Sequence, residues 1–229
     1  MIDVVAIDGP AGAGKSSVSR AVARELGYDY VDTGAMYRVV GVLAHERGVA
    51  NDDIAALVQL CDGLEISFEE GGGNLRVVAN GRDLSRDIRT ADAGQWASKR
   101  STVPAVRERM VALQRRMAAV GQVVMEGRDI GTVVCPEAVV KVYLDASPRE
   151  RARRRAAELE ARGESIDLGR MVKEIEERDA RDRGRAHSPM RPAADAVRID
   201  TTGRSLESVI DEICTLVRTR KGGARPQRP

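Results

Sequence analysis

The chain is short of aromatic residues and of cysteine. Its 229 residues include one Trp, one Phe and four Tyr. Proteins that coat single-stranded nucleic acid stack bases on several aromatic side chains, so this scarcity argues against that class. The three cysteines, Cys61, Cys135 and Cys214, are widely spaced and form no C-x-x-C pair, which argues against a disulfide framework or a cysteine-rich zinc site. We therefore expect reduced thiols and a cytoplasmic location.

The sequence also lacks a long apolar run and a strong net charge. No stretch approaches the roughly 20 apolar residues of a membrane span, and no leader segment opens the chain. The formal net charge is +2, with 31% charged and 42% hydrophobic residues, which is the balance of a globular protein and not of one that coats nucleic acid. The two histidines, His45 and His187, form no pair for a metal site or a nucleophile triad. We expect no membrane partner, no nucleic-acid partner and a monomer.

The most informative feature that is present is a glycine-rich loop with the pattern G-x-x-x-x-G-K-S. It consists of Gly9, Pro10, Ala11, Gly12, Ala13, Gly14, Lys15, Ser16 and Ser17. Glycines let backbone N–H groups turn around a phosphate, Lys15 can reach the β- and γ-phosphates, and the Ser16 hydroxyl can ligate Mg²⁺. The alternative is a glycine-rich turn before an ordinary helix. Because an apolar run precedes the loop and a helical pattern follows it, we expect a nucleoside triphosphate such as ATP to bind here with Mg²⁺.

Five apolar runs alternate with helical segments. They cover residues 2–8, 28–32, 123–126, 139–145 and 196–200. This alternation predicts an α/β fold of three layers, with a five-stranded parallel sheet covered by helices on both faces. Ligands of such sheets sit outside the carboxyl ends of the strands. Acidic residues fall at those ends, and several of them must cap loops and helices instead of binding ligands; they are Asp8, Asp32, Glu126, Asp145 and Asp200.

Two segments interrupt the alternation. Residues 64–88 resemble a small antiparallel unit, which two helical stretches follow at 91–102 and 104–119. Residues 147–191 are strongly charged and rich in Arg. Residues 221–229 contain almost no apolar side chain and are expected to form a disordered tail. We expect one domain over residues 1–220.

Two short motifs at strand ends carry candidate binding groups. Thr33 is a natural helix N-cap, and Tyr37 and Arg38 follow one turn later. These groups suit a second phosphorylated molecule, although a capped helix with an amphipathic Tyr is the alternative. Arg128 and Asp129 follow a glycine and could clamp a phosphate and a polar base or sugar. The alternative for this pair is a local salt bridge that shapes the turn.

A third set of residues falls on one predicted helix face, at positions i, i+3, i+4 and i+7: Arg178, Arg181, Asp182 and Arg185. Clustered guanidinium groups repel one another unless an anion lies between them. A lid that closes on transferring phosphates would use them in this way, whereas the neighbouring acids leave an ordinary charged helix as the alternative. The chain has no N-K-x-D motif of GTPases, and Ala146 follows Asp145 where motor ATPases carry Glu. These observations favour phosphoryl transfer between two bound anions.

With these motifs assembled, the chain resembles the bacterial cytidylate (CMP) kinases of the nucleoside monophosphate kinase group. The resemblance rests on the runs I-D-G-P-A-G-A-G-K-S at 7–16, D-T-G-A-M-Y-R at 32–38, E-G-R-D-I-G-T-V-V at 126–134 and R-D-A-R-D-R at 178–183. It covers nearly the whole chain, in the order of the family.

The resemblance implies the transfer of a phosphoryl group from ATP to CMP or dCMP. It implies an inserted monophosphate-binding lobe at 34–120 and a helical lid at 149–190. Lys15, Arg178 and Arg181 would act on the transferring group, and Asp182 and Arg185 would meet the pentose or the phosphate of the acceptor. The other implied acceptor-binding residues are Thr33, Tyr37, Arg38, Ser98, Arg107, Arg128 and Asp129. The resemblance leaves the role of Glu126 open.

Two other functions remain possible at this point. A small-metabolite kinase of the shikimate or gluconate type would share the scaffold, but the antiparallel insert and the G-R-D segment count against it. A nucleotide-dependent RNA-binding protein could use the Arg-rich helix, but the low net charge and the few aromatics disfavour it.

Overall fold

The structure is a computed structural model that describes residues 2–71, 74–161, 163, 165–185 and 187–222. The chain divides into two compact units. The first, called the core unit here, comprises Met1–Tyr30 and Ala118–Pro229, and the second, the inserted unit, comprises Val31–Met117. Within the described residues, no helix is long and apolar enough to cross a membrane.

The core unit is built around a five-stranded sheet in the order β2-β6-β1-β7-β8, whose edge strand β2 crosses into the inserted unit at Val31. Its strands are β1 (Ile2–Asp8), β2 (Asp29–Asp32), β6 (Val123–Gly127), β7 (Ala138–Asp145) and β8 (Val197–Asp200). Most residues of β1, β6 and β7 are buried, as expected of central strands that are covered on both faces. The predicted five-stranded parallel sheet is confirmed, and the predicted strand limits differ from the observed ones by one residue at most.

The carboxyl ends of the central strands lie in register. Asp8 of β1 pairs with Gly127 of β6, and Asp145 of β7 pairs with Asp200 of β8. Asp145 Oδ1 accepts the Ala146 N–H, while Asp200 Oδ1 accepts a hydrogen bond from a backbone N–H two residues later. These two carboxylates therefore shape their own loops, as expected for part of this set.

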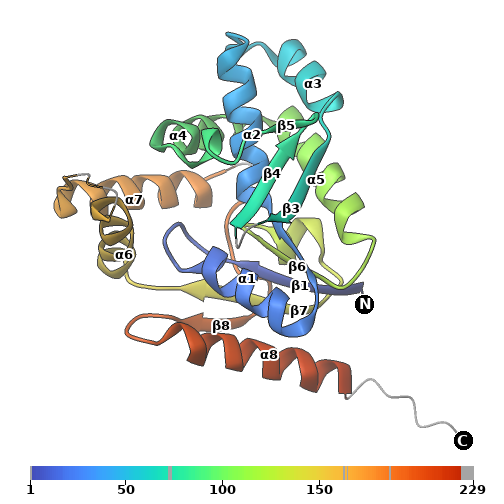
Figure 1. Cartoon of the computed structure of the whole chain (residues 1–229), viewed down its shortest axis with the longest axis vertical. Coiled ribbons are helices and arrows are strands. Elements are labelled where there is room, and N and C mark those ends of the chain that lie inside the picture. The colour runs from blue at the N-terminus through green and yellow to red at the C-terminus, as the bar shows by residue number, and fades with distance from the viewer. Residues whose placement is uncertain (1, 72–73, 162, 164, 186, 223–229) are drawn as a thin grey trace, which may run out of the picture. The chain divides into compact units, whose positions relative to one another are not determined.

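Figure 1 shows α8 along the sheet of the core unit and α6 and α7 as an adjacent pair. The α-helices described in this unit are α1 (Lys15–Leu26), α6 (Pro148–Glu160), α7 (Leu168–Arg183) and α8 (Leu206–Gly222). The pair α6–α7 encloses a small apolar cluster that includes Ala152, Met171 and Ile175.

The last helix runs further than the sequence predicted. Lys221, expected in the tail, lies in the last turn of α8, and its Nζ donates to Asp3 Oδ2 at 2.8 Å and to the Tyr28 hydroxyl. This anchorage to β1 explains why Lys221 and Gly222 remain helical. The rest of the predicted tail, 223–229, lies outside the described residues.

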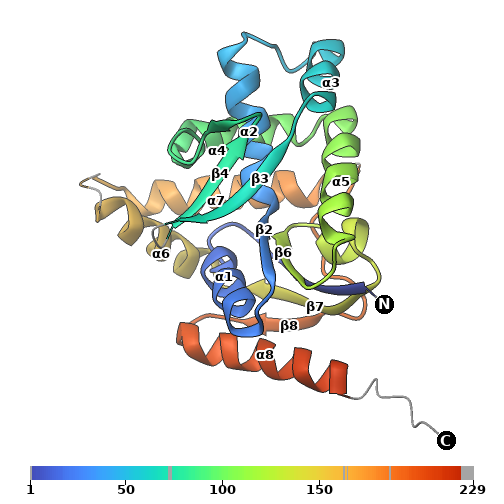
Figure 2. The ribbon, with the colours of Figure 1, turned by 45° about the vertical axis from the view of Figure 1, so that its right-hand side comes forward.

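The inserted unit combines helices with a small antiparallel sheet, visible as the β3–β4 ribbon in Figure 2. Its elements are α2 (Thr33–Glu46), α3 (Ile54–Asp62), β3 (Ile66–Gly71), β4 (Asn74–Ala79), β5 (Arg82–Asp83), η1 (Asp87–Arg89), α4 (Ala91–Arg100) and α5 (Pro104–Ala118). The order β3-β4-β5 confirms the predicted antiparallel insert. The glycine-rich turn between its first two strands contains residues 72 and 73, which lie outside the described residues.

Two close contacts join α2 to α4 within the inserted unit. A Cβ on Gly41 would lie 3.0 Å from the Ala97 nitrogen and from Trp96 Cβ, so glycine is what lets the two helices approach here. The rings of His45 and Trp96 stack at 3.8 Å. These contacts fix the position of α4, which carries Ser98, relative to α2.

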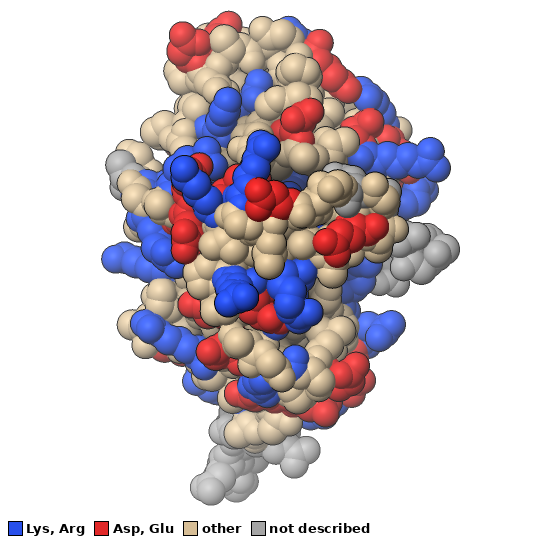
Figure 3. Space-filling view, turned by 90° about the vertical axis from the view of Figure 1, so that its left-hand side faces the viewer, with Lys and Arg blue, Asp and Glu red and all other residues tan. Residues whose placement is uncertain are grey.

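The surface charge is mixed. Figure 3 shows one face of the molecule, where Lys and Arg side chains are interspersed with Asp and Glu. On α6 and α7 oppositely charged side chains also pair, as in Arg153–Glu150 and Arg170–Glu174, each at 2.9 Å. That face therefore presents no uniformly basic surface of the kind that binds a nucleic-acid backbone.

Candidate functional site

The glycine-rich loop joins β1 to α1 at the carboxyl edge of the core sheet. Gly9, Gly12 and Gly14 have φ angles of +148°, +78° and +85°. A Cβ on Gly9 would lie 2.0 Å from the Leu144 carbonyl oxygen of β7, so only glycine fits there. No described side chain caps the start of α1. This start is therefore suited to an anion, because the first N–H groups of a helix have no partner within the helix.

Lys15 opens α1 and is 93% buried, because its relative exposure is only 7%. Its Nζ donates to the Pro10 carbonyl at 2.7 Å, which folds the side chain back over the loop. Burial lowers the pKa of Lys15 to about 7; the charges of Arg128 and Arg178 add to this effect and Glu126 opposes it. A bound phosphate would add negative charge beside these cations and favour the charged form of Lys15.

Three residues that were not predicted as site residues contact the backbone of the glycine-rich loop or support such a contact. Arg151 of α6 donates from Nη1 to the Ala11 carbonyl at 3.0 Å. Thr201 Oγ1 lies 3.0 Å from the Asp145 carbonyl and 3.4 Å from the Ala13 carbonyl of the loop, and its one proton can be donated to either. Arg154 in turn donates to Thr201 Oγ1 and to its carbonyl, at 2.9 and 2.6 Å. Arg151 and Arg154 belong to a run of arginines with no local feature other than charge, so a sequence pattern could not separate them from their exposed neighbours.

The G-R-D segment is anchored by Asp8 at the end of β1. After Asp129, the π-helical turn η2 (Ile130–Val134) begins, and the Asp8 oxygens accept the N–H groups of Ile130 and Gly131, both at 2.8 Å. Burial raises the pKa of Asp8 to about 7, against the effect of these two hydrogen bonds. Through these two hydrogen bonds, Asp8 fixes the position of the segment that follows Arg128 and Asp129.

We expect Asp8→Asn to be the less stable protein at acid pH, where the native carboxyl is protonated, and to gain about 3 kcal/mol relative to the unaltered protein between pH 5 and pH 8, because the native carboxyl must then ionise against its burial. Asparagine has one acceptor oxygen, and its NH₂ group would face the second backbone N–H. Urea unfolding measures the effect, with Asp167→Asn as the control. Asp167 also accepts a backbone N–H, but as the exposed N-cap of α7, where Asn is equally good. A stability difference between Asp8→Asn and the unaltered protein that did not change with pH would contradict the burial of the Asp8 carboxylate against the Ile130 and Gly131 N–H groups.

Arg128 is paired across a long sequence separation. Its Nε donates to Asp182 Oδ2 at 3.0 Å, over 54 residues, and Arg185 contacts the other oxygen of the same carboxylate. Arg128 Nε therefore pairs with this distant carboxylate and does not form the alternative local salt bridge with Asp129. Burial alone would raise the pKa of Asp182, but the charges of Arg128, Arg185 and Arg178 outweigh it and hold the pKa below its usual value.

The prediction that Arg178, Arg181, Asp182 and Arg185 share one helix face is wrong for Arg181 and Arg185. Helix α7 ends at Arg183 and Gly184 caps it, so Arg185 lies beyond the helix and reaches back to Asp182. Asp182 is buried and Arg181 is exposed. Arg178 is half-buried, and it lies close enough to Lys15 to lower the pKa of that lysine. Thus Arg178, Asp182 and Arg185 meet Arg128 and Lys15 in the core unit, whereas Arg181 faces solvent.

Glu126, whose role the sequence left open, is 3% exposed at the end of β6. The hydroxyl of Tyr30, also buried, donates to Glu126 Oε1. The carboxylate is also near enough to Lys15 to raise its pKa, against the effect of burial. Glu126 therefore supplies negative charge beside the loop lysine and is held in place by Tyr30.

The inserted unit contains the other predicted acceptor-binding residues. Arg107 of α5 is 4% exposed, and its guanidinium lies 5.4 Å from the centre of the Tyr37 ring on α2. Ser98 of α4 is also buried, and its Oγ has no hydrogen-bond partner among the described residues. Arg38 is half-buried. Polar groups buried in this way suit a polar ligand.

Thr33 does not cap α2, contrary to the sequence-based expectation. Asp32 is the N-cap, and its Oδ1 accepts the Ala35 N–H at 2.8 Å, while Thr33 is the first residue of the helix and is buried. Asp and Thr are both good N-caps, so propensity alone cannot choose between neighbours. The Thr33 hydroxyl is therefore not used as the helix cap.

Known proteins resemble this chain along nearly its whole length. A family model described as "Cytidylate kinase" matches residues 5–219. A protein named "Cytidylate kinase" from Geobacter sulfurreducens is 48% identical over 218 residues, which cover 95% of this chain and 94% of that protein. One of the same name from Pelotomaculum thermopropionicum is 50% identical over 214 residues, covering 93% of this chain and 95% of that protein.

A solved structure shares the fold at low sequence identity. It is an uncharacterized protein from Eubacterium ventriosum with a TM-score of 0.54 and 10% identity. The match covers 96% of this chain and 99% of the other chain.

Proposed function

Because this chain belongs to the cytidylate kinase family and phosphorylates CMP, we propose that it takes the phosphoryl group from ATP with Mg²⁺ and accepts dCMP as well as CMP. A phosphate oxygen of the acceptor attacks the γ-phosphorus of ATP, the bond to the β-phosphate oxygen breaks, and ADP leaves. No covalent intermediate with the protein is needed.

The donor site of this proposal is the loop Gly9–Ser17. The observation that carries it is the glycine backbone of this loop, which leaves no room for a Cβ at Gly9 and leads into an uncapped helix start. Ser16 is exposed at that start and would ligate Mg²⁺. Among the described residues, no group of three or more His, Cys, Asp or Glu could hold a metal ion, so the ion would be held with the nucleotide phosphates. Bound there, Mg²⁺ would neutralise charge on the β- and γ-phosphates.

We assign the remaining roles from the resemblance of these motifs to those of the family, together with the contacts described above. Lys15 and Arg178 would neutralise the transferring group, and Arg181 would join them only if the exposed side chain turned inward. Asp182 and Arg185 would meet the pentose or phosphate, in place of part of their present pairing with Arg128. The other residues proposed to hold the acceptor are Thr33, Tyr37, Arg38, Ser98, Arg107, Arg128 and Asp129. In this proposal residues 34–120 form the monophosphate-binding lobe and residues 149–190 form the lid.

The proposal includes a monomeric, cytoplasmic enzyme with neither membrane nor nucleic acid as partner. All three cysteines are free and buried, which is compatible with a reducing compartment. The mixed charge of the face in Figure 3 gives no support to the RNA-binding alternative.

A coupled assay of ADP release tests the acceptor. We expect turnover with CMP and dCMP, and slow turnover with UMP and AMP, because the base edge would be read by Ser98, Arg107 and Asp129. Selective turnover of UMP or AMP would contradict the cytosine assignment. RNA affinity that falls with salt, without CMP turnover, would favour the RNA-binding alternative.

A further inference from the structure

The core unit contains a deeply buried ion pair that has no role in the proposed reaction. Arg151 of α6 and Asp179 of α7 are each 2% exposed at the side chain, and Arg151 Nη1 lies 2.7 Å from Asp179 Oδ2. Replacing such a pair with apolar residues often leaves stability unchanged or raises it, so stability alone is weak reason for its presence.

Arg151 makes two further contacts, both to backbone carbonyls. Nε donates to the Ala146 carbonyl at 2.9 Å and Nη1 donates to the Ala11 carbonyl of the glycine-rich loop at 3.0 Å. The carbonyl and the following N–H of a planar trans peptide point in opposite directions. By holding the Ala11 carbonyl, Arg151 therefore directs the Gly12 N–H away from α6. Loop N–H groups are what would bind the donor phosphates.

Asp179 stands beside the residues of α7 that face the site. Arg178 precedes it, and Asp182, one turn later, pairs with Arg128. The same guanidinium thus contacts the loop at Ala11 and the helix at Asp179. A shift of α7 would change the orientation of a loop peptide, and a shift of the loop would move Arg178.

We propose that Arg151 and Asp179 form a positioning pair that sets the glycine-rich loop and α7 in register for phosphoryl transfer. The inference rests on the proposed roles of the loop and of Arg178. Neither member of the pair touches substrate in this proposal. Both act through groups that do: Arg151 through the Ala11–Gly12 peptide, and Asp179 through the placement of its neighbour Arg178.

The double variant R151M/D179L separates positioning from stability. It leaves no buried unpaired charge, so we expect its urea midpoint to stay close to that of the unaltered enzyme, whereas R151M and D179L alone leave one charge unpaired and are less stable. We expect kcat/KM for ATP, at saturating CMP, to fall about 10²-fold in the double variant, since misplacement by about 1 Å has effects of this size. The dissociation constant for CMP, measured by calorimetry without ATP, should change by less than about threefold.

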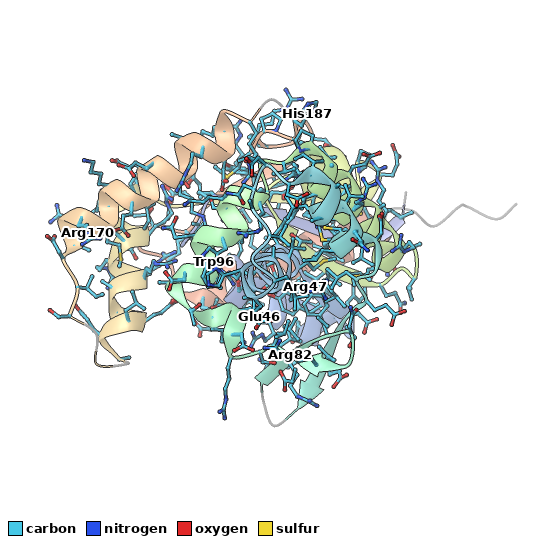
Figure 4. The ribbon with its side chains drawn as sticks, turned by 90° about the horizontal axis from the view of Figure 1, so that it is seen from above. Glu46, Arg47, Arg82, Trp96, Arg170 and His187 are labelled. Carbon is cyan, nitrogen blue, oxygen red and sulfur yellow. The ribbon has the colours of Figure 1, made fainter. Side chains whose placement is uncertain are left out.

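The control is R170M/E174L, which removes an exposed pair of the same helix. The Arg170 and Glu174 side chains are 79% and 48% exposed, and Figure 4 shows Arg170 at the outer end of α7. We expect normal kcat/KM for ATP in this variant. R151K offers a second measure if the double variant does not fold. Lysine keeps the charge but not the fork of donors, so kcat/KM for ATP should fall to an intermediate value.

Wild-type kcat/KM for ATP in folded R151M/D179L, or in R151K, would overturn the positioning role. An equal loss of CMP affinity would also overturn it, because it would indicate general damage to the fold. Absence of CMP turnover in the unaltered enzyme would instead contradict the proposed function, so the two failures are distinct.

Discussion

Lys15→Ala is expected to lower kcat by about 10³-fold while CMP binds with nearly unchanged affinity. The lysine is buried beside Arg128 and Arg178, and its Nζ is held over the loop by the Pro10 carbonyl. Charge on the γ-phosphoryl oxygens and on the departing ADP is stabilised by such fixed cations, and water cannot replace a buried one. Steady-state kinetics with both substrates, together with CMP calorimetry, measures the split.

Lys173→Ala is the matched control, because Lys173 is an exposed lysine of α7 in the same unit. It should keep normal kinetics. Since Lys15 is a poorly solvated cation, its removal should not lower the urea midpoint, which separates the kinetic effect from unfolding. A loss of CMP affinity alone, with normal kcat, would show that Lys15 serves the acceptor instead of the donor.

The parts of the site that the sequence predicted are those encoded by adjacent residues. The loop from Gly9 to Ser17 needs only a strand before it and a helix after it, and both are visible as local apolar patterns. The parallel sheet follows from the same patterns. The antiparallel insert was predicted from its apolar runs and turn residues, and its antiparallel pairing is confirmed.

The pairings inside the site could not be predicted in this way. Arg128 meets Asp182 over 54 residues, and Arg151 meets Ala11 over 140. In the sequence, Arg151 is one of several arginines on a charged helix, and its burial depends on how that helix packs on the loop and on α7. A local sequence pattern shows which side chains carry charge, whereas the tertiary fold determines which of these charges are buried and paired.

Gly9→Ala is expected to destabilise the core unit by about 3 kcal/mol or more and to lower kcat/KM for ATP by about 10²-fold. Two effects add. At φ +148° an L-residue is strained, and its Cβ would lie 2.0 Å from the Leu144 carbonyl oxygen, a backbone atom of the central strand β7 that cannot move aside without disturbing the sheet. The loop must therefore move instead, which withdraws its N–H groups from the position where the donor phosphates would bind.

Gly27→Ala distinguishes this clash from the strain of a positive φ alone. Gly27 caps the other end of α1 at φ +68°, and a Cβ there would meet nothing within 4 Å. It should cost about 1 kcal/mol and leave kcat/KM unchanged. Urea unfolding and ATP kinetics compare the two variants. If Gly9→Ala behaved like Gly27→Ala, the loop would not be held against β7, and the close approach of Gly9 to Leu144 would have no part in binding the donor. If Gly9→Ala lost much more stability and kcat/KM than Gly27→Ala, the close packing of the loop against β7 would set the shape of the donor site. Glycine at position 9 would then be required by packing as well as by backbone conformation.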